Sequence, residues 1–300
     1  METNSKLEER FARSLASNDT RTRSRTLKRL TQWVVARSSI EDGFTELEFL
    51  KLWKGLYTCM WHSDKPLVQE ELVDSLAGLL VMMRRPDAAL QYLRTFFTTI
   101  AREWHSIDRL RLDKFYLLLR KMLGQSFKLL QNSQWDEEVV QEFISIIKDG
   151  PLNHDLGKTT LGVQLHVLEV YVSELLMCSP VEGGVDLLNP PLALLANTRD
   201  TTVSGCIVRS VLDVLDTSTL DQLQLTPEAV SDALRAMAIN RDTLGRNRKL
   251  LYTHCKRFSS DECPPPDSGC GLPQPKRFKR KSKGKIKIKK KIKKKMKKKL

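Results

Sequence analysis

The sequence lacks the motifs on which the commonest catalytic and cofactor sites depend. It contains no Gly-x-Ser-x-Gly elbow, no His-Glu-x-x-His pair and no Cys-x-x-Cys pair, which excludes the usual signatures of hydrolases, zinc proteases and zinc fingers. Gly157-Lys158-Thr159 does not complete a phosphate-binding loop, because Leu152 stands where that loop needs its first glycine. We therefore predict a protein that is not an enzyme, with no catalytic residues, no cofactor and no metal.

The sequence also lacks a long hydrophobic run. Its longest apolar stretch, residues 77–83, is too short to cross a bilayer. Residues 1–16 are charged at short intervals and do not look like a secretory signal. The six cysteines follow no regular spacing, so we expect reduced thiols inside the cell. A structural zinc at His254, Cys255, Cys263 and Cys270 is the weaker alternative.

Sustained alternation of polar and apolar residues, the mark of a strand, is missing as well. Apolar residues recur instead at spacings of three and four, as at Leu50, Trp53, Tyr57 and Met60. Helix starts are indicated by the pair Thr45 and Glu48, which fits a capping box, and by Thr226 before a proline. We also expect Asp64, just before Lys65-Pro66, to accept a hydrogen bond at the start of a helix. The pattern predicts about a dozen helices.

Residues 112–123 are apolar on almost every side of the predicted helix. Such a helix has to be covered on more than one face, which favours helices stacked in two layers. We predict an all-α fold, either a HEAT- or armadillo-like α-solenoid or an irregular helical bundle. The sequence shows no clean repeat at a fixed period, so the second architecture stays open. The predicted helical body covers residues 1–258.

Acidic residues are absent from the last 25 positions. Of the 50 Lys and Arg residues, 17 lie at 276–300, so the other 275 residues hold 33 basic and 36 acidic side chains and are close to neutral. Residues 259–275, rich in proline, read as an extended linker. We expect 276–300 to be disordered and to bind RNA phosphates or direct nuclear import. The residues assigned to this role are Lys276, Arg277, Lys279, Arg280, Lys281, Lys283, Lys285, Lys287, Lys289, Lys290 and Lys291.

Two further patterns, one in the basic tail and one in an early helix, each allow an RNA-binding explanation and a simpler one. Ile288, Ile292, Met296 and Leu300 recur every fourth residue, so the tail could fold into an amphipathic helix on binding RNA, or the spacing could be chance. Near the other end, three basic residues share one face of an early helix and a fourth lies beside them. A solvated surface is the favoured explanation of this second set, with RNA contact as the alternative. These four residues are Arg21, Arg25, Lys28 and Arg29.

Residues 107–114 place five charges of both signs at the start of the most apolar helix. We expect Asp108 to cap that helix and Asp113 to pair with Arg109, one turn away. A structural network of ion pairs is favoured over a surface for a partner, and the two can coexist.

Two blocks of the sequence resemble the eukaryotic ribosomal RNA-processing protein 1 family. The first reads Leu-Trp-Lys-Gly-Leu-Tyr-Thr-Cys-Met-Trp at 52–61 and Asp-Lys-Pro-Leu-Val-Gln-Glu-Glu-Leu at 64–72. The second reads Arg-Glu-Trp at 102–104 and Ile-Asp-Arg-Leu-Arg-Leu-Asp-Lys-Phe-Tyr at 107–116. The likeness becomes weaker after residue 131, and relatives usually have a longer, charge-mixed extension at the C-terminal end.

The resemblance implies a nuclear, nucleolar scaffold with a helical-repeat body, bound to pre-rRNA, ribosomal proteins and other assembly factors in pre-60S particles. It implies a role in maturation of the 5.8S and large-subunit rRNA, without a small-molecule substrate or a membrane. A nuclear helical-repeat adaptor without a direct RNA role is the alternative, and a membrane-surface protein held by the tail is a third. From the two blocks we select as candidate partner-binding residues Trp61, Asp64, Lys65, Asp108, Arg109, Arg111, Asp113 and Lys114.

Overall fold

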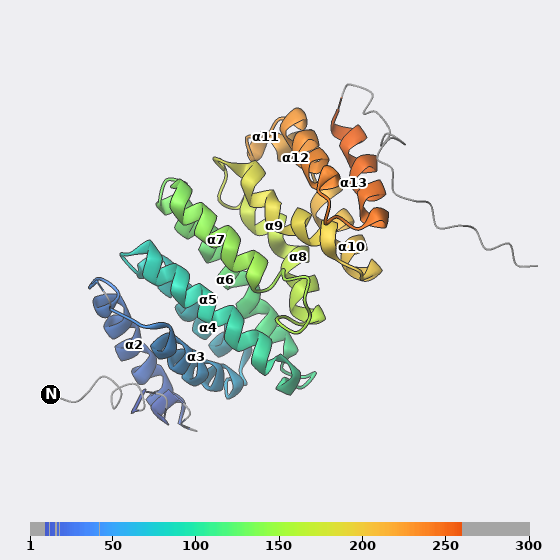
Figure 1. The fold of residues 1–300 in the computed structure, drawn as a ribbon. Helices are drawn as coiled ribbons and strands as arrows, with labels where there is room; N and C mark the ends of the chain where they lie inside the picture. Colours follow the sequence, from blue (N-terminus) through green and yellow to red (C-terminus); the bar gives the residue numbers. More distant parts are fainter. Residues whose placement is uncertain (1–9, 12, 16, 18, 42, 260–300) are drawn as a thin grey trace, which may run out of the picture. The chain divides into compact units, whose positions relative to one another are not determined.

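The computed structural model describes residues 10, 11, 13–15, 17, 19–41 and 43–259. Every regular element among these residues is helical, which confirms the predicted all-α class. With the labels of Figure 1, the helices are α2 (Thr20–Arg37), α3 (Glu46–Trp61), α4 (Pro66–Met82), α5 (Pro86–Glu103), η1 (Trp104–Ser106), α6 (Leu112–Asn132), α7 (Glu137–Asp149), α8 (Leu161–Leu176), α9 (Gly184–Asn197), α10 (Thr201–Ile207), the π-helix η2 (Val208–Leu212), α11 (Thr217–Gln222), α12 (Pro227–Ile239) and α13 (Gly245–Phe258).

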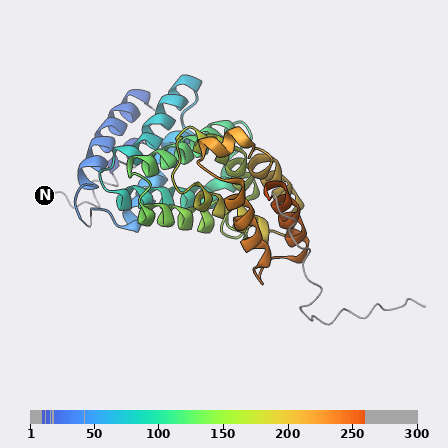
Figure 2. The ribbon, with the colours of Figure 1, turned by 90° about the horizontal axis from the view of Figure 1, so that it is seen from above.

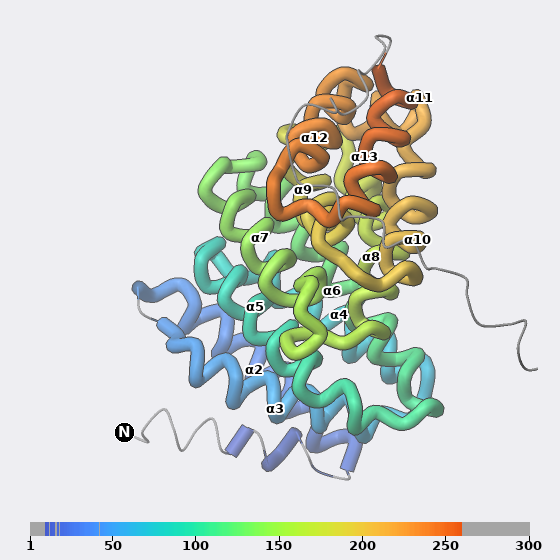
Figure 3. The backbone as a smooth tube through the Cα atoms, turned by 45° about the vertical axis from the view of Figure 1, so that its right-hand side comes forward, coloured from blue at the N-terminus to red at the C-terminus, as the bar shows by residue number. Residues whose placement is uncertain are grey.

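From α2 to α10 the helices alternate between two layers. One layer holds α3, α5, α7 and α9, and the other holds α2, α4, α6, α8 and the α10–η2 segment. Within each layer a helix packs beside the helix two places further along the chain (Figures 1 and 3). This is the stacking of an α-solenoid of helical repeats, in agreement with the first of the two predicted architectures.

The last helices depart from this alternation. α12 and α13 pack against each other, and both contact α9 (Figure 2, in orange and brown). The final described helix ends at Phe258, where the sequence analysis ends the helical body. The linker and the tail lie outside the described residues, as do the predicted RNA-contacting lysines and arginines from 276 to 291.

Aromatic side chains link helices within one layer and across the two layers. The indole N–H of Trp53 on α3 donates to the carbonyl oxygen of Tyr92 on α5 at 2.9 Å, and the two rings are stacked with centroids 4.6 Å apart. The Tyr92 hydroxyl in turn donates to Leu76 on α4 at 3.2 Å. Because both polar groups are buried and bonded, these aromatic residues add apolar burial without leaving unsatisfied donors.

α6 is buried on several sides, as its apolar sequence predicts. It contacts α4 and α8 within its own layer and α5 in the other layer. Its fully buried side chains include Phe115, Leu119, Met122, Leu123 and Phe127. The start of α6 is therefore fixed within the core of the solenoid, and the residues just before it lie on the surface.

Of the four helix-start predictions, two are confirmed and two are wrong. Thr45 and Glu48 form the predicted capping box, and the Thr226 side chain accepts from Ala229 N. The expectation for Asp64 is wrong, because Pro66 fixes the first position of α4 and makes Lys65 the N-cap, without a side-chain capping bond. The expectation for Asp108 is wrong as well, because α6 begins only after Arg111.

No helix in the described part of the chain is long and apolar enough to span a membrane. Cys255, one of the residues of the alternative zinc site, is buried, with its Sγ 3.1 Å from the hydroxyl of Ser231. Cys263 and Cys270 lie outside the described residues.

Candidate partner-binding site

The end of α3 and the start of α6 meet through the side chain of Lys114. Its Nζ donates to the carbonyl oxygens of Trp61 at 2.8 Å and Ser63 at 2.7 Å. Trp61 is the last residue of α3, and Lys114 lies in the first turn of α6, only 5% exposed. Lys114 therefore anchors the loop between α3 and α4 to α6, and it brings together the two blocks singled out in the sequence.

Arg111 covers Trp61 from the outside. Its guanidinium carbon lies 4.8 Å from the centre of the indole ring, a cation–π contact. The same guanidinium forms an ion pair with Asp108, whose second carboxylate oxygen accepts from Leu110 N at 3.0 Å. Asp108 therefore stabilises the turn that precedes α6 and holds Arg111 in position over the indole.

Burial and nearby charges shift the pKa values of Lys114 and Asp108. Burial lowers the pKa of Lys114, the nearby Arg111 lowers it further, and the carboxylates of Asp64 and Asp108 oppose this. For Asp108, burial raises the pKa, but the hydrogen bond and the charge of Arg111 outweigh it and lower the pKa below its ordinary value. Asp64 contributes its charge, since no hydrogen bond links it to Lys114 in the described structure.

Several side chains of this site point into solvent. Arg109, Asp113 and Lys65 are exposed, and the expected ion pair between Arg109 and Asp113 does not form in the described part of the chain. Leu110 is 94% exposed and Leu67, at the start of α4, is 74% exposed. Tryptophan and arginine, here in contact, are the residue types enriched at protein–protein contact sites, and the exposed leucines add apolar surface that a partner could cover.

Comparison with known proteins gives one family for this site and its scaffold. The family described as "Nucleolar protein, Nop52" matches residues 6–255 of the chain. The chain belongs to the Nop52 family. The match includes both sequence blocks and every described residue of the site, so the resemblance identified from the sequence is confirmed.

Relatives of this Nop52-family chain carry the name of ribosomal RNA processing protein 1. The mouse ribosomal RNA processing protein 1 homolog A is 36% identical over 232 residues, 76% of this chain and 45% of the mouse protein. The human homolog B is 37% identical over 227 residues, 73% of this chain and 29% of the human protein. The Drosophila melanogaster homolog is 32% identical over 224 residues, 71% of this chain and 32% of that protein. The chain thus spans less than half the length of each of these relatives.

The family and these names confirm the predicted nucleolar and nuclear location at the level of the family, and they support a role in ribosome biogenesis. The names of these relatives do not say which residues contact a partner. The assignment of the site described above to partner binding therefore stays a proposal.

Sequence reasoning missed three residues of the Nop52-family site. Tyr57 lies one turn before Trp61, with its ring centre 5.1 Å from that of Phe115 and its hydroxyl 3.1 Å from Ser106 Oγ. It links the surface indole to the buried core. The helical spacing from Tyr57 to Trp61 could have indicated it. Leu67 and Leu110 were detectable as apolar residues placed outside the buried stripes.

Proposed function

We propose that this Nop52-family chain is a non-enzymatic scaffold of pre-60S particles, required for maturation of the 5.8S and large-subunit rRNA. Its partners on this proposal are pre-rRNA, ribosomal proteins and other assembly factors. The tail at 276–300 would add affinity for RNA phosphates and direct import into the nucleus. The observation that supports the proposal most strongly is the convergence of the two family-like blocks on one exposed surface.

The convergence needs an explanation beyond folding. Lys114 and Asp108 have structural roles, because they hold the loop and the turn in place. Leu110 has no such role, because its side chain is 94% exposed, and Leu67 is also largely exposed. Burying an exposed leucine against a partner contributes roughly 1.5–3 kcal/mol. A fixed turn that presents the exposed Leu110 next to Arg111, which lies over the Trp61 indole, fits a docking site for another protein.

The experiment that tests this proposal replaces Leu110 with aspartate in the full chain. The variant should fold normally, because the side chain makes little contact with the body, but a charge placed in a protein interface is costly. We expect Leu110→Asp to lose co-sedimentation with large-subunit precursors and to leave unprocessed 5.8S and large-subunit pre-rRNA.

Leu47→Asp is the matched control. Leu47 is 61% exposed in the first turn of the same helix that ends at Trp61, about 21 Å away along the helix axis. The control should co-sediment like the unaltered chain. Normal co-sedimentation and processing with Leu110→Asp would contradict the proposal. Crosslinking of the chain to RNA distinguishes the proposed scaffold from the alternative, a nuclear adaptor without a direct RNA role. The scaffold requires a crosslink to pre-rRNA, and the adaptor does not.

A further inference from the structure

The outer face of α2 carries a stripe of cations, Arg21, Arg25 and Lys28, with Arg29 beside it. These residues are exposed, and their spacings of four, three and one place them on one side of the helix. Within the described structure, none of the four side chains has a salt bridge or a side-chain hydrogen bond. We call this set the α2 stripe.

Other arginines of α2 have partners inside the body. Arg37 forms a 2.6 Å ion pair with Glu48 and lies 4.4 Å from the ring centre of Phe44. Arg23 is 9% exposed and donates to the carbonyl oxygen of Ser17 at 2.7 Å. The contacts of Arg37 and Arg23 within the body explain why these two arginines are present. The residues of the α2 stripe make no such contacts in the described structure.

The stripe opposes the stability of its own helix. Arg21–Arg25 and Arg25–Arg29 are like charges four residues apart, a spacing at which they repel. The first turn of α2 has no acidic residue, and Arg21 places a positive charge near the positive end of the helix dipole. Since folding gains nothing from this arrangement, a ligand outside the described body is the better explanation.

We propose that the α2 stripe binds the phosphate backbone of RNA. Three of its four residues are arginines, whose planar guanidinium group suits bidentate contact with phosphate. The remaining exposed residues of this face of α2 are small or polar, such as Ser24, Gln32 and Ala36, and the exposed Met82 lies across the groove on α4. From Arg21 to Arg29 the stripe extends about 12 Å along the helix axis. The choice of RNA over another polyanion rests on the proposed function.

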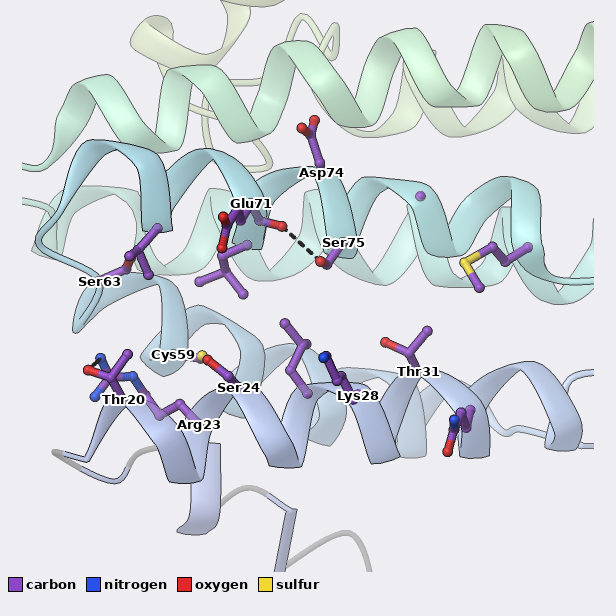
Figure 4. A pocket seen from close by; sticks show the side chains of 16 residues that line it. Thr20, Arg23, Ser24, Lys28, Thr31, Cys59, Ser63, Glu71, Asp74 and Ser75 are labelled. Atoms are coloured by element: carbon purple, nitrogen blue, oxygen red, sulfur yellow. Dashed lines mark hydrogen bonds between the residues drawn. The ribbon is translucent and has the colours of Figure 1, made fainter.

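A groove of roughly 470 Å³ beside the stripe favours one path for the RNA. Figure 4 shows Ser24, Lys28 and Thr31 along its α2 edge and Glu71 and Ser75 on the α4 side. The hydroxyls on the α2 edge can bond phosphate or ribose beside Lys28. Glu71 on the opposite edge repels phosphate, so the backbone should follow α2 and not the floor of the groove.

A second hollow extends the basic surface. Arg84, after the end of α4, lines it together with Gln32 and Ala36 of α2. Arg84 is exposed, so a fifth cation lies beyond the C-terminal end of the α2 stripe. The proposed RNA path therefore runs from Arg21 toward Arg84 along the α2 edge of the groove.

The test compares the full chain with a variant in which Arg21, Arg25, Lys28 and Arg29 are all changed to glutamine. Binding of a mixed-sequence single-stranded RNA is measured by fluorescence anisotropy over a range of salt concentrations. Each lost phosphate contact reduces the slope of log affinity against log salt by about 0.7, so four contacts reduce it by about 3. At moderate salt the affinity should fall by at least about tenfold.

The matched control removes four exposed lysines that are scattered over other helices, as Lys51→Gln, Lys54→Gln, Lys128→Gln and Lys148→Gln. It has the same net charge as the stripe variant, and it should change the affinity less than about threefold, because its lysines are spread over α3, α6 and α7 and do not form one row of four. Equal weakening in the two variants, or an unchanged slope in the stripe variant, would overturn the inference. So would stripe-dependent binding to phosphatidylserine vesicles without an effect on RNA.

Thermal unfolding separates a binding role from a structural one. The stripe variant should unfold at the same temperature as the unaltered chain or slightly higher, because repulsion is removed. If it fails to fold, Arg25→Gln alone should still reduce the salt slope by about 0.7. The Leu110→Asp experiment tests the proposed scaffold separately, so the stripe inference can fail while the proposed function stands.

Discussion

Lys114 is a buried cation whose direct partners are backbone carbonyls and not a carboxylate. The carbonyl oxygens of Trp61 and Ser63 accept its two bonds, and Asp64 acts on it through charge. An arrangement of this kind stabilises a loop because a bond to a charged donor is stronger than a neutral one. At the scale of single residues, Lys114 is the side chain that makes the proposed docking surface rigid.

Lys114→Met should lower the free energy of unfolding by about 1–3 kcal/mol, because two backbone carbonyls lose their donor. Lys54→Met, at an exposed position on α3, is the control and should stay within about 0.5 kcal/mol. Urea denaturation of both variants measures the difference. Stability at or above that of the unaltered chain would mean that desolvation of the ammonium group costs more than its bonds contribute.

We expect the folded chain to lose stability in mild acid because of His166. Burial lowers its pKa below the ordinary value of 6.5, while its bond to the Tyr116 carbonyl, 2.9 Å away, and the charge of Glu169 oppose this only in part. As the pH falls through 6.5, the unfolded chain takes up the proton first, so the folded state loses stability until the folded pKa is passed. His254 is shifted in the same direction, also mainly by burial.

His166→Gln should reduce this dependence on pH, because glutamine can donate to the Tyr116 carbonyl and does not titrate. The measurement is the urea midpoint of the unaltered chain and the variant on either side of pH 6.5. His105→Gln, at an exposed position, should keep the full acid loss. An acid loss of the same size in His166→Gln would show that another group causes it.

At the scale of elements, local signals place helix starts only when the neighbouring residues agree. The Thr45–Glu48 box was predictable because it depends on residues three apart, and Glu48 Oε2 accepts from Thr45 N at 2.8 Å. Asp64 failed because Pro66 fixes the start of α4 one residue later than the acidic side chain requires. The Arg109–Asp113 pair failed because Arg109 precedes α6, so the helical spacing does not apply to it.

Thr45→Ala should lower the free energy of unfolding by about 1 kcal/mol, since the N-terminus of α3 loses its capping bond. Thr160→Ala is the matched control, because Thr160 is the N-cap of α8 without a capping bond and its buried hydroxyl has no hydrogen-bond partner in the described structure. The control should lose no stability, because its buried hydroxyl makes no hydrogen bond that the substitution could remove. Equal losses in denaturation experiments would show that the capping box adds nothing.

At the scale of the whole body, the two layers were predictable and the contacts between distant segments were not. The helical spacing and the all-round apolar surface of α6 pointed to stacked helices. The bond from Lys114 to Trp61 joins residues 53 positions apart, and local patterns contain no information about such a contact. The same holds for the exposure of Leu110, which depends on where the turn before α6 lies in the folded body.

The division of roles between body and tail is the central claim. The body, through Leu110 and its surroundings, should determine which particle the chain binds. The tail should add affinity that depends on the charge of the RNA and not on its nucleotide sequence. Two chains separate these roles: one with Leu110→Asp and an intact tail, and one without residues 276–300.

The most direct test is the sedimentation of these two chains with large-subunit precursors at moderate salt. We predict that the chain without residues 276–300 still co-sediments with the precursors, at reduced occupancy, and that Leu110→Asp does not. The opposite result, in which Leu110→Asp co-sediments like the unaltered chain and the chain without its tail is released, would contradict a docking surface on the helical body.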